Sequence, residues 1–202
     1  MNRILSSISF IFHPLIMPLL GVIFYFSKSP RFIPLEIIQA KLISIFILTI
    51  ILPILIYFLL KTLGKTKTIY LKTTQERILP LSINSIIIYL ILQRVFPPNE
   101  IIELYFFFVG ILLSTLTCFI LAFLKFKASI HMISIGGVLM FFIALSIHFS
   151  ININGTLALM TIIAGAIASS RLHLKAHDLK EIIIGFCVGF FPQLTLLNYW
   201  LI

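Results

Sequence analysis

The feature that most constrains this chain is a succession of long apolar runs. Spanning about 30 Å of hydrocarbon takes roughly 20 apolar residues in helical form. Seven runs of about this kind occupy residues 8–26, 42–60, 78–95, 104–124, 130–149, 157–168 and 182–202, and they are numbered one to seven here. The sequence therefore predicts a protein that crosses the bilayer several times.

The composition excludes a soluble globular domain. Hydrophobic residues make up 60% of the chain and charged residues 10%, whereas soluble chains carry about 25% charged residues. The mean hydropathy is +1.17. The unbroken Ile, Leu and Phe runs lack the alternation of a membrane barrel. We expect an all-α polytopic transmembrane helical bundle of about six or seven helices, forming a single integral membrane domain over residues 1–202.

Run one differs from the others because it contains His13, Pro14 and Pro18. Proline removes a backbone donor and clashes with the preceding turn, so this run is predicted to be kinked or broken. An interfacial or re-entrant course is the alternative to a full span. The run continues to Phe26 without a small-residue cleavage site, so we expect the N-terminus to be retained.

The formal net charge of +9 comes from 15 Lys and Arg residues against 6 acidic residues. Such a balance is typical of proteins that bind nucleic acid, anionic lipid or an anionic substrate. No water-exposed module with a basic face or a stacking platform is visible, so nucleic acid is not expected as a partner. Cys118 and Cys187 lie inside apolar runs and predict neither a disulfide framework nor a thiolate metal site.

Polar residues gather in alternate connections, which in a helical bundle lie on the same side of the membrane. The connections after runs two, four and six therefore share one end. They hold Lys61, Lys65, Lys67, Lys72, Arg77, Lys125, Lys127, Arg171, Lys175 and Lys180, together with His131, His173 and His177. The opposite end holds Lys28, Arg31, Lys41 and Arg94. Three remote segments are thus predicted to meet at one end of the bundle.

The most informative segment runs from Ser169 to Glu181. His177 and Glu181 are four residues apart, which places them on one face if the last helix begins nearby. A carboxylate on one ring nitrogen fixes the tautomer of a histidine and leaves the other nitrogen as a nucleophile. Arg171 offers a planar fork that suits phosphate oxygens.

Two further segments add to this end of the bundle. Ser129 and His131 stand where run five begins, and the start of a helix attracts anions. Lys72 and Arg77 stand before run three. Together the segments predict a cationic pocket with two histidines.

These residues resemble the motifs of the type 2 phosphatidic acid phosphatase superfamily, which also contains bacterial acid phosphatases and vanadium haloperoxidases. Its three segments read K-x6-R-P, P-S-G-H and S-R-x5-H-x3-D, in that order along a helical bundle. Ser170, Arg171 and His177 match the third segment at the right spacing, with Glu181 in place of the aspartate.

The other two segments match less closely. Ser129 and His131 fit the second segment, with Ile130 in place of glycine and no preceding proline. Lys72 and Arg77 correspond to the first, but four residues separate them and Pro80 follows three positions after Arg77. The resemblance covers residues 72–189, which would form a phosphatase-like core.

The resemblance implies a membrane-embedded phosphatase that acts on a lipid phosphate or pyrophosphate, such as a polyprenyl pyrophosphate or a phosphatidic acid. His177 would attack phosphorus to give a phosphohistidine, Glu181 would orient it, and His131 would protonate the leaving oxygen and later activate water. No metal and no cofactor are expected, because fixed cations neutralise the phosphoryl group. The phosphate-binding residues would be Lys72, Arg77, Ser129 and Arg171.

A noncatalytic relative that binds or translocates an anionic lipid is the alternative. Ile130 stands where glycine would let the backbone approach a phosphate closely, and a branched side chain there narrows or reshapes the pocket. That residue and the irregular first segment favour the alternative, whereas the two histidines with Glu181 favour the phosphatase. A purely structural subunit would leave the clustered Arg and His residues unexplained.

The remaining polar residues are given structural roles. We expect His173 to be a loop residue that faces headgroups, Asp178 to cap the last helix, and His148 to end a helix near the opposite interface. The resemblance suggests a bacterial inner membrane. Charge bias places the motif end in the cytoplasm, whereas many members of the superfamily carry the site on the periplasmic or lumenal side. The side of the membrane, the lipid substrate and the oligomeric state stay open.

Overall fold

The structure, a computed structural model, describes residues 2–64 and 73–201, with the backbone alone for residues 2–6. Every regular element in these ranges is a helix, which confirms the predicted all-α fold for this part of the chain. A π-helical turn, η1 (Ile47–Ile51), joins α3 to α4, and a short 3-10 helix, η2 (Leu197–Tyr199), follows α9. The α-helices are α1 (Asn2–Ile11), α2 (Met17–Lys28), α3 (Leu35–Phe46), α4 (Leu52–Thr62), α5 (Thr74–Arg94), α6 (Ile102–Phe123), α7 (Ile130–His148), α8 (Asn154–His173) and α9 (Leu179–Leu196).

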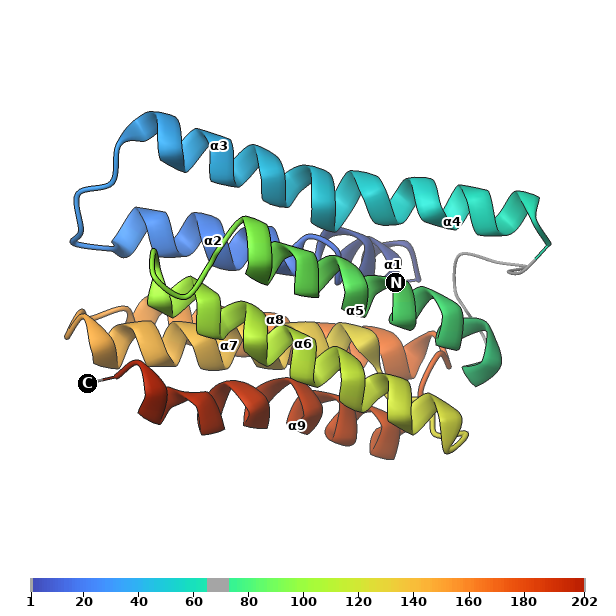
Figure 1. The fold of residues 1–202 in the computed structure, drawn as a ribbon. Helices are drawn as coiled ribbons and strands as arrows, with labels where there is room; N and C mark the ends of the chain where they lie inside the picture. The colour runs from blue at the N-terminus through green and yellow to red at the C-terminus, as the bar shows by residue number, and fades with distance from the viewer. Residues whose placement is uncertain (1, 65–72, 202) are drawn as a thin grey trace.

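Six helical segments are long and apolar enough to cross a bilayer, and α2 is a shorter apolar helix. The six are α3 to α4 taken together, α5, α6, α7, α8, and α9 with η2. Figure 1 shows the helices lying roughly alongside one another, as expected for a membrane bundle. The prediction of a polytopic membrane protein is confirmed at this level.

The predicted break in the first run is present. Helix α1 ends at Ile11 and α2 begins at Met17, and a turn closed by a hydrogen bond from the N–H of Ile16 to the carbonyl of His13 separates them. Pro14 follows His13 directly and Pro18 lies in the first turn of α2, where its missing N–H breaks no helical bond. The first run is therefore two helices rather than one span.

The sixth predicted apolar run, residues 157–168, is shorter than the helix that forms there. Helix α8 extends from Asn154 to His173, so it includes Arg171, and His173 is its last residue rather than part of a loop. Hydrophobicity marks only the membrane-facing middle of a span, whereas the backbone continues in helical form through polar residues at either end. By contrast, α7 ends at His148 as expected.

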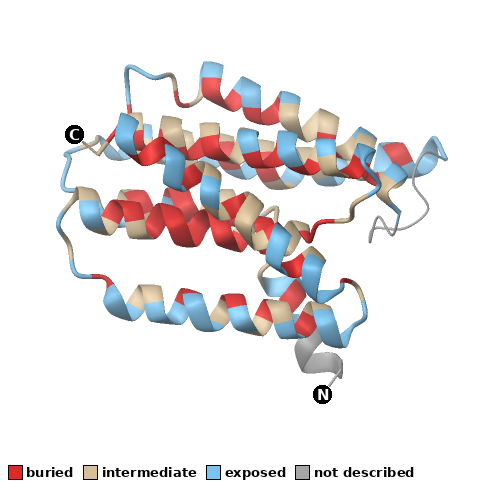
Figure 2. Cartoon of the chain, turned by 90° about the horizontal axis from the view of Figure 1, so that it is seen from below, coloured by how far each residue is buried: buried red, intermediate tan, exposed pale blue. Residues whose placement is uncertain are grey.

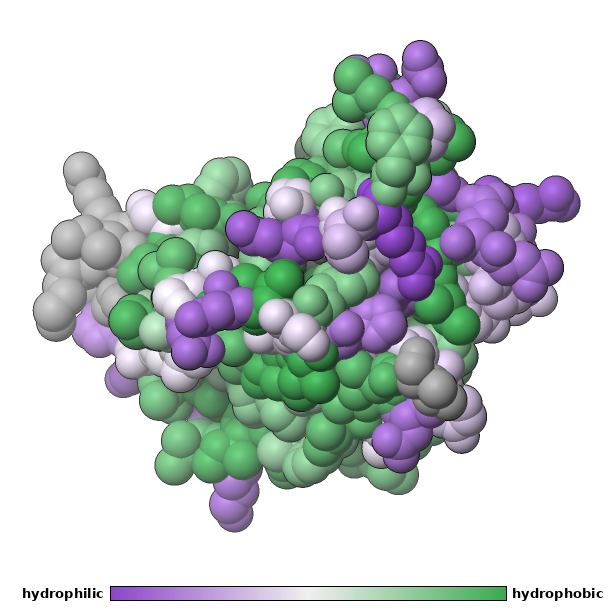
Figure 3. Space-filling model, turned by 90° about the vertical axis from the view of Figure 1, so that its left-hand side faces the viewer, coloured by the Kyte–Doolittle hydropathy of each residue, from purple (hydrophilic) through white to green (hydrophobic). Residues whose placement is uncertain are grey.

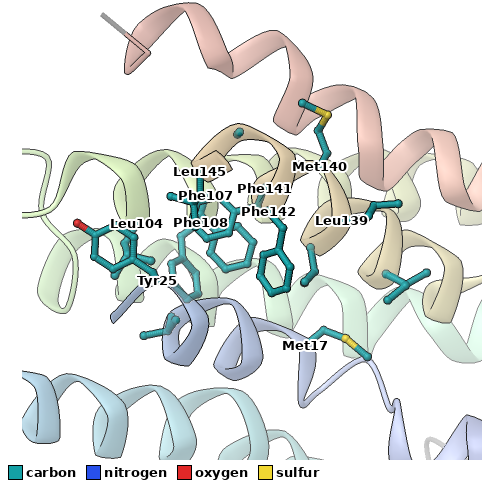
Figure 4. Close-up of a cluster of buried hydrophobic side chains, with 14 of the residues drawn as sticks. Met17, Tyr25, Leu104, Phe107, Phe108, Leu139, Met140, Phe141, Phe142 and Leu145 are labelled. Carbon is teal, nitrogen blue, oxygen red and sulfur yellow. The ribbon is translucent and has the colours of Figure 1, made fainter. Parts of the chain in front are cut away.

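Helix α7 lies at the centre of the bundle and contributes more buried residues than any other described helix. Buried residues concentrate in the middle of the molecule and exposed ones along the outer helices (Figure 2). The rings of Phe107 and Phe141 stack at 4.1 Å between centroids, and those of Phe24 and Phe142 stack at 3.8 Å. Figure 4 shows this cluster of side chains between α2, α6 and α7. Stacked aromatic rings thus join three helices around α7.

Glycines let α7 and α9 approach each other closely. The Cα of Gly189 on α9 lies so near the carbonyl of Ile133 on α7 that a Cβ there would overlap it. A Cβ at Gly185 would come within 2.8 Å of the carbonyl oxygen of Ser129. Small residues spaced by four are a common means of close packing between membrane helices.

A buried carboxylate organises the opposite end of the bundle. Glu103 is fully buried and binds Arg31 at 2.8 Å, Nε2 of His148 at 3.1 Å and the hydroxyl of Tyr25 at 3.2 Å. This end faces the viewer in Figure 3, where hydrophilic side chains gather among hydrophobic ones. A buried charge requires such partners, so Glu103 ties the start of α6 to α2, α7 and the segment after α2.

We expect Gly189→Ala to destabilise the fold by about 2 kcal/mol or more, because the added methyl group pushes α9 away from α7. Gly165→Ala is the matched control. Gly165 is a helical glycine of α8 with nothing within 4 Å of an added Cβ, so this variant should be unchanged or up to about 1 kcal/mol more stable. Melting of both variants in detergent, followed by circular dichroism, checks the prediction. Equal melting temperatures would contradict it.

Candidate active site

Three segments that are far apart in the sequence meet at one end of the bundle. Nη1 of Arg77, in the first turn of α5, donates to the carbonyl of Ala128 at 2.7 Å. Nζ of Lys127 donates to the carbonyl of Ala176 at 2.8 Å. Figure 1 shows the start of α5, the end of α6 and the start of α9 together at its right-hand end. The predicted convergence of the second and third segments with Arg77 is therefore present.

The segments that precede α7 and α9 are also joined through the backbone. The N–H of Ser129 donates to the carbonyl of Glu181 at 3.1 Å. This bond requires the close approach that Gly185 permits. It fixes the first turns of the two helices relative to each other.

His177 lies two residues before the start of α9 and is oriented by Glu181. Nδ1 of His177 and Oε2 of Glu181 are 2.6 Å apart, and the histidine side chain is only 2% exposed. A carboxylate accepts hydrogen bonds, so in the neutral ring the proton lies on Nδ1 and the lone pair on Nε2. The contact expected from the four-residue spacing is present.

Glu181 is itself held by a capping box at the start of α9. Asp178 is the N-cap residue and accepts from the N–H of Glu181 at 2.7 Å, as predicted. The N–H of Asp178 donates in return to Oε2 of Glu181 at 3.3 Å. Reciprocal bonds of this kind fix both side chains, so one carboxylate serves the helix start and the histidine together.

The electrostatic surroundings keep His177 neutral. Burial is the main cause that lowers the pKa of its imidazole, and the positive charges of Arg77, Lys127 and Arg171 lower it further. A backbone hydrogen bond with Lys127 acts in the opposite direction. At neutral pH the ring therefore has an unprotonated nitrogen, as a nucleophile requires.

Ser129 offers a buried hydroxyl to this site. The residue is fully buried as the N-cap of α7, and its Oγ has no hydrogen-bond partner among the residues that the structure describes. Buried polar atoms in folded proteins are nearly always paired with protein, water or a bound group. The hydroxyl of Ser129 can therefore bond a water molecule or a polar ligand at the first turn of α7.

His131 stands in the first turn of α7 and meets the N-terminal segment. Its Nε2 lies 3.1 Å from the carbonyl oxygen of Ser9, to which it donates. Its ring contacts the ring of His13 edge to face, with 5.5 Å between centroids. The hydroxyl of Ser9 is also 2.7 Å from that of Ser170. The segment around residues 9–13 is thus part of this end of the bundle.

Arg171 lies in the last turn of α8. Its positive charge lowers the pKa of both His177 and His13, so the guanidinium acts on both rings. Lys72, the remaining residue of the predicted set, falls outside the described residues.

Sequence reasoning gave no role in the site to Lys127, Ser9 or His13. Lys127 stands two residues before Ser129, and a lysine preceding the S-x-H pattern was the available signal. For Ser9 and His13 the sequence offered only a histidine beside a proline in a broken apolar run. That pattern does not indicate which other helix the segment will contact.

Ile130 occupies the position where the resembled motif has glycine. Its side chain packs with the apolar cluster that contains Leu81, Cys118 and Ile133, between α5, α6 and α7. The isoleucine therefore has a packing role in addition to its place in the motif.

Among the described residues, no group of three or more His, Cys, Asp or Glu side chains could hold a metal ion. Metal-independent chemistry stays a prediction. No family model matches the chain, and no curated protein or solved structure matches it either.

We expect Lys127→Gln to raise the pKa of His177, because it removes one of the positive charges that disfavour the imidazolium. The ring should remain partly desolvated, so the pKa should stay below its usual value of about 6.5. Nitrogen-15 NMR of histidine side chains measures this titration, with His177→Ala to assign the signal. Lys125→Gln, at an exposed lysine two residues away, is the control. An unchanged titration would show that Lys127 does not act on this ring.

Proposed function

We propose that the protein is a membrane-embedded, metal-independent phosphatase that hydrolyses a lipid phosphate or pyrophosphate through a phosphohistidine intermediate. The observation that carries the proposal is the His177–Glu181 pair at 2.6 Å, in an otherwise cationic setting. A neutral histidine held by a carboxylate and surrounded by fixed positive charges suits attack on a phosphate. The negative charge of the phosphate repels anionic nucleophiles but not a neutral imidazole.

In the first step, Nε2 of His177 attacks phosphorus and the bond from phosphorus to the lipid oxygen breaks. His131, protonated once the anionic phosphate is bound, gives one proton to that leaving oxygen and becomes neutral. The products are the lipid alcohol, or the lipid monophosphate from a pyrophosphate, and a phosphohistidine. Glu181 stabilises the positive charge that develops on the His177 ring. Arg77, Arg171 and Ser129 would hold the phosphoryl oxygens as charge spreads over them.

In the second step, water attacks the phosphohistidine and the bond between nitrogen and phosphorus breaks. His131, now neutral, takes a proton from the water and becomes an imidazolium again, which returns both histidines to their starting forms and releases phosphate. The proton balance closes without a metal or a cofactor. Fixed guanidinium and ammonium groups supply the positive charge.

An apolar groove between α6 and α9 suits the tail of the lipid. It is lined by Thr117 of α6 and by Ile184, Cys187, Val188, Phe191 and Pro192 of α9. Ile184 stands three residues after Glu181, so the groove begins within one turn of the candidate site. A tail in this groove would leave its phosphate near the cationic end.

The noncatalytic alternative, a protein that binds or translocates an anionic lipid, is favoured by one observation. The Nε2 proton of His131 is engaged by the carbonyl of Ser9, so in this conformation it is not offered to a leaving group. A binding protein would need the cations but not the transfer of that proton. Turnover separates the two functions.

His177→Ala is expected to abolish phosphate release from lipid phosphates and binding of vanadate, which mimics pentacoordinate phosphorus. The purified protein in detergent is assayed against a panel of lipid phosphates and polyprenyl pyrophosphates. His173→Ala is the matched control, because His173 is exposed at the same end of the bundle. Release of phosphate at the wild-type rate by His177→Ala would remove the proposed mechanism, and lipid binding without turnover by the wild type would favour the alternative.

Glu181→Gln is expected to lower kcat by roughly a thousandfold, because an amide can donate to Nδ1 and so stabilise the wrong tautomer of His177. Asp178→Asn is the control, since asparagine caps helices as well as aspartate does. This second variant should keep at least a large part of the activity. Equal losses in both variants would indicate that only the start of α9 matters.

A further inference from the structure

The N-terminal segment forms part of the wall of the candidate site. Ser9 is buried, and its hydroxyl and its carbonyl contact Ser170 of α8 and His131 of α7 respectively. These two contacts join residues more than a hundred positions apart in the chain. They place the turn that follows α1 beside the residues proposed to bind phosphate.

His13 is the chemically active side chain of this turn. Its ring meets the ring of His131 at an interplanar angle of 78°. The N–H of Leu15 donates to Nδ1 of His13 at 3.3 Å, so Nδ1 acts as an acceptor. In the neutral ring the proton must then lie on Nε2. The backbone turn thus presets His13 as a hydrogen-bond donor through Nε2.

His13 is a neutral hydrogen-bond donor near the positive charge of Arg171. Burial and the positive charge of Arg171 both lower its pKa, so the ring is neutral at neutral pH. A neutral donor adds a hydrogen bond to an anion without adding another positive charge to the cationic cluster.

We propose that His13 is a third histidine of the anion site, and that its Nε2–H donates a hydrogen bond to a phosphate oxygen on the side where His131 lies. This inference rests on the proposed function and adds a phosphate-binding residue from the N-terminal segment. The resembled motifs contain no residue in this part of the chain. The site would be incomplete without the turn between α1 and α2.

Three variants of the full chain distinguish a role of the His13 N–H donor from a role of its ring. His13→Ala removes both, His13→Phe keeps a ring without the donor, and His13→Gln restores an N–H at about the position of Nε2. Binding of orthovanadate to the detergent-purified protein is measured by isothermal titration calorimetry, and KM and kcat are measured on a lipid phosphate. His173→Ala is again the control.

We expect His13→Ala and His13→Phe to weaken vanadate binding by about tenfold or more, as loss of a hydrogen bond to a charged group does. KM should rise in proportion. His13→Gln should bind within about threefold of the wild type, and His173→Ala should match it.

The possible outcomes distinguish this inference from the proposed function. If the wild type binds vanadate and turns over, but His13→Ala does so equally well, the role of His13 is overturned and the phosphatase stands. If His13→Phe restores binding and His13→Gln does not, the ring has only a packing role, and the inference is overturned. If the wild type neither binds vanadate nor releases phosphate, the proposed function fails and the inference fails with it.

Discussion

The hydrogen bond from the N–H of Ser129 to the carbonyl of Glu181 is the contact on which the candidate site depends. It joins the first turns of α7 and α9, and those turns carry or adjoin both histidines of the proposed mechanism. The bond forms because Gly185 has no side chain to separate the two backbones. Packing of small residues along the middle of the bundle therefore sets the geometry of the chemistry at its end.

Polar contacts stabilise the two ends of this apolar bundle in different ways. At one end, the single carboxylate of Glu103 is enclosed by Arg31, His148 and Tyr25, so its charge is matched. At the other end, positive groups surround His177 and the acidic partner is already committed to that histidine and to the start of α9. The charges around Glu103 are therefore balanced, whereas positive charge is in excess around His177. An anionic ligand would balance that excess, which is the physical basis of the proposed function.

The N-terminal segment links the fold to the proposed chemistry. Its break at Pro14 lets α1 turn away from α2 and bring Ser9 against His131. The carbonyl of Ser9 accepts the proton that His131 would otherwise offer to a leaving group. Binding of substrate in the proposed mechanism therefore has to replace this hydrogen bond, and His13 stands beside the exchange.

The sequence by itself determined the class of fold and the local geometry of its strongest motif. Long apolar runs allow only helices in a bilayer, because each backbone group must bond within its own segment. The His177–Glu181 contact and the cap at Asp178 both follow from the chemistry of helix starts, where the third helical residue turns its side chain back toward the residues before the helix. These features depend on residues within a few positions of one another.

Tertiary structure alone decided that Ser9, His13 and Lys127 join the candidate site. The contacts of Ser9 with His131 and Ser170, and of Lys127 with Ala176, join segments whose spacing in the sequence has no periodic relation. The same holds for Glu103, whose partners come from three other parts of the chain. Such contacts depend on how whole helices cross and on where a glycine permits close approach. Both are collective properties of packing that no short stretch of sequence contains.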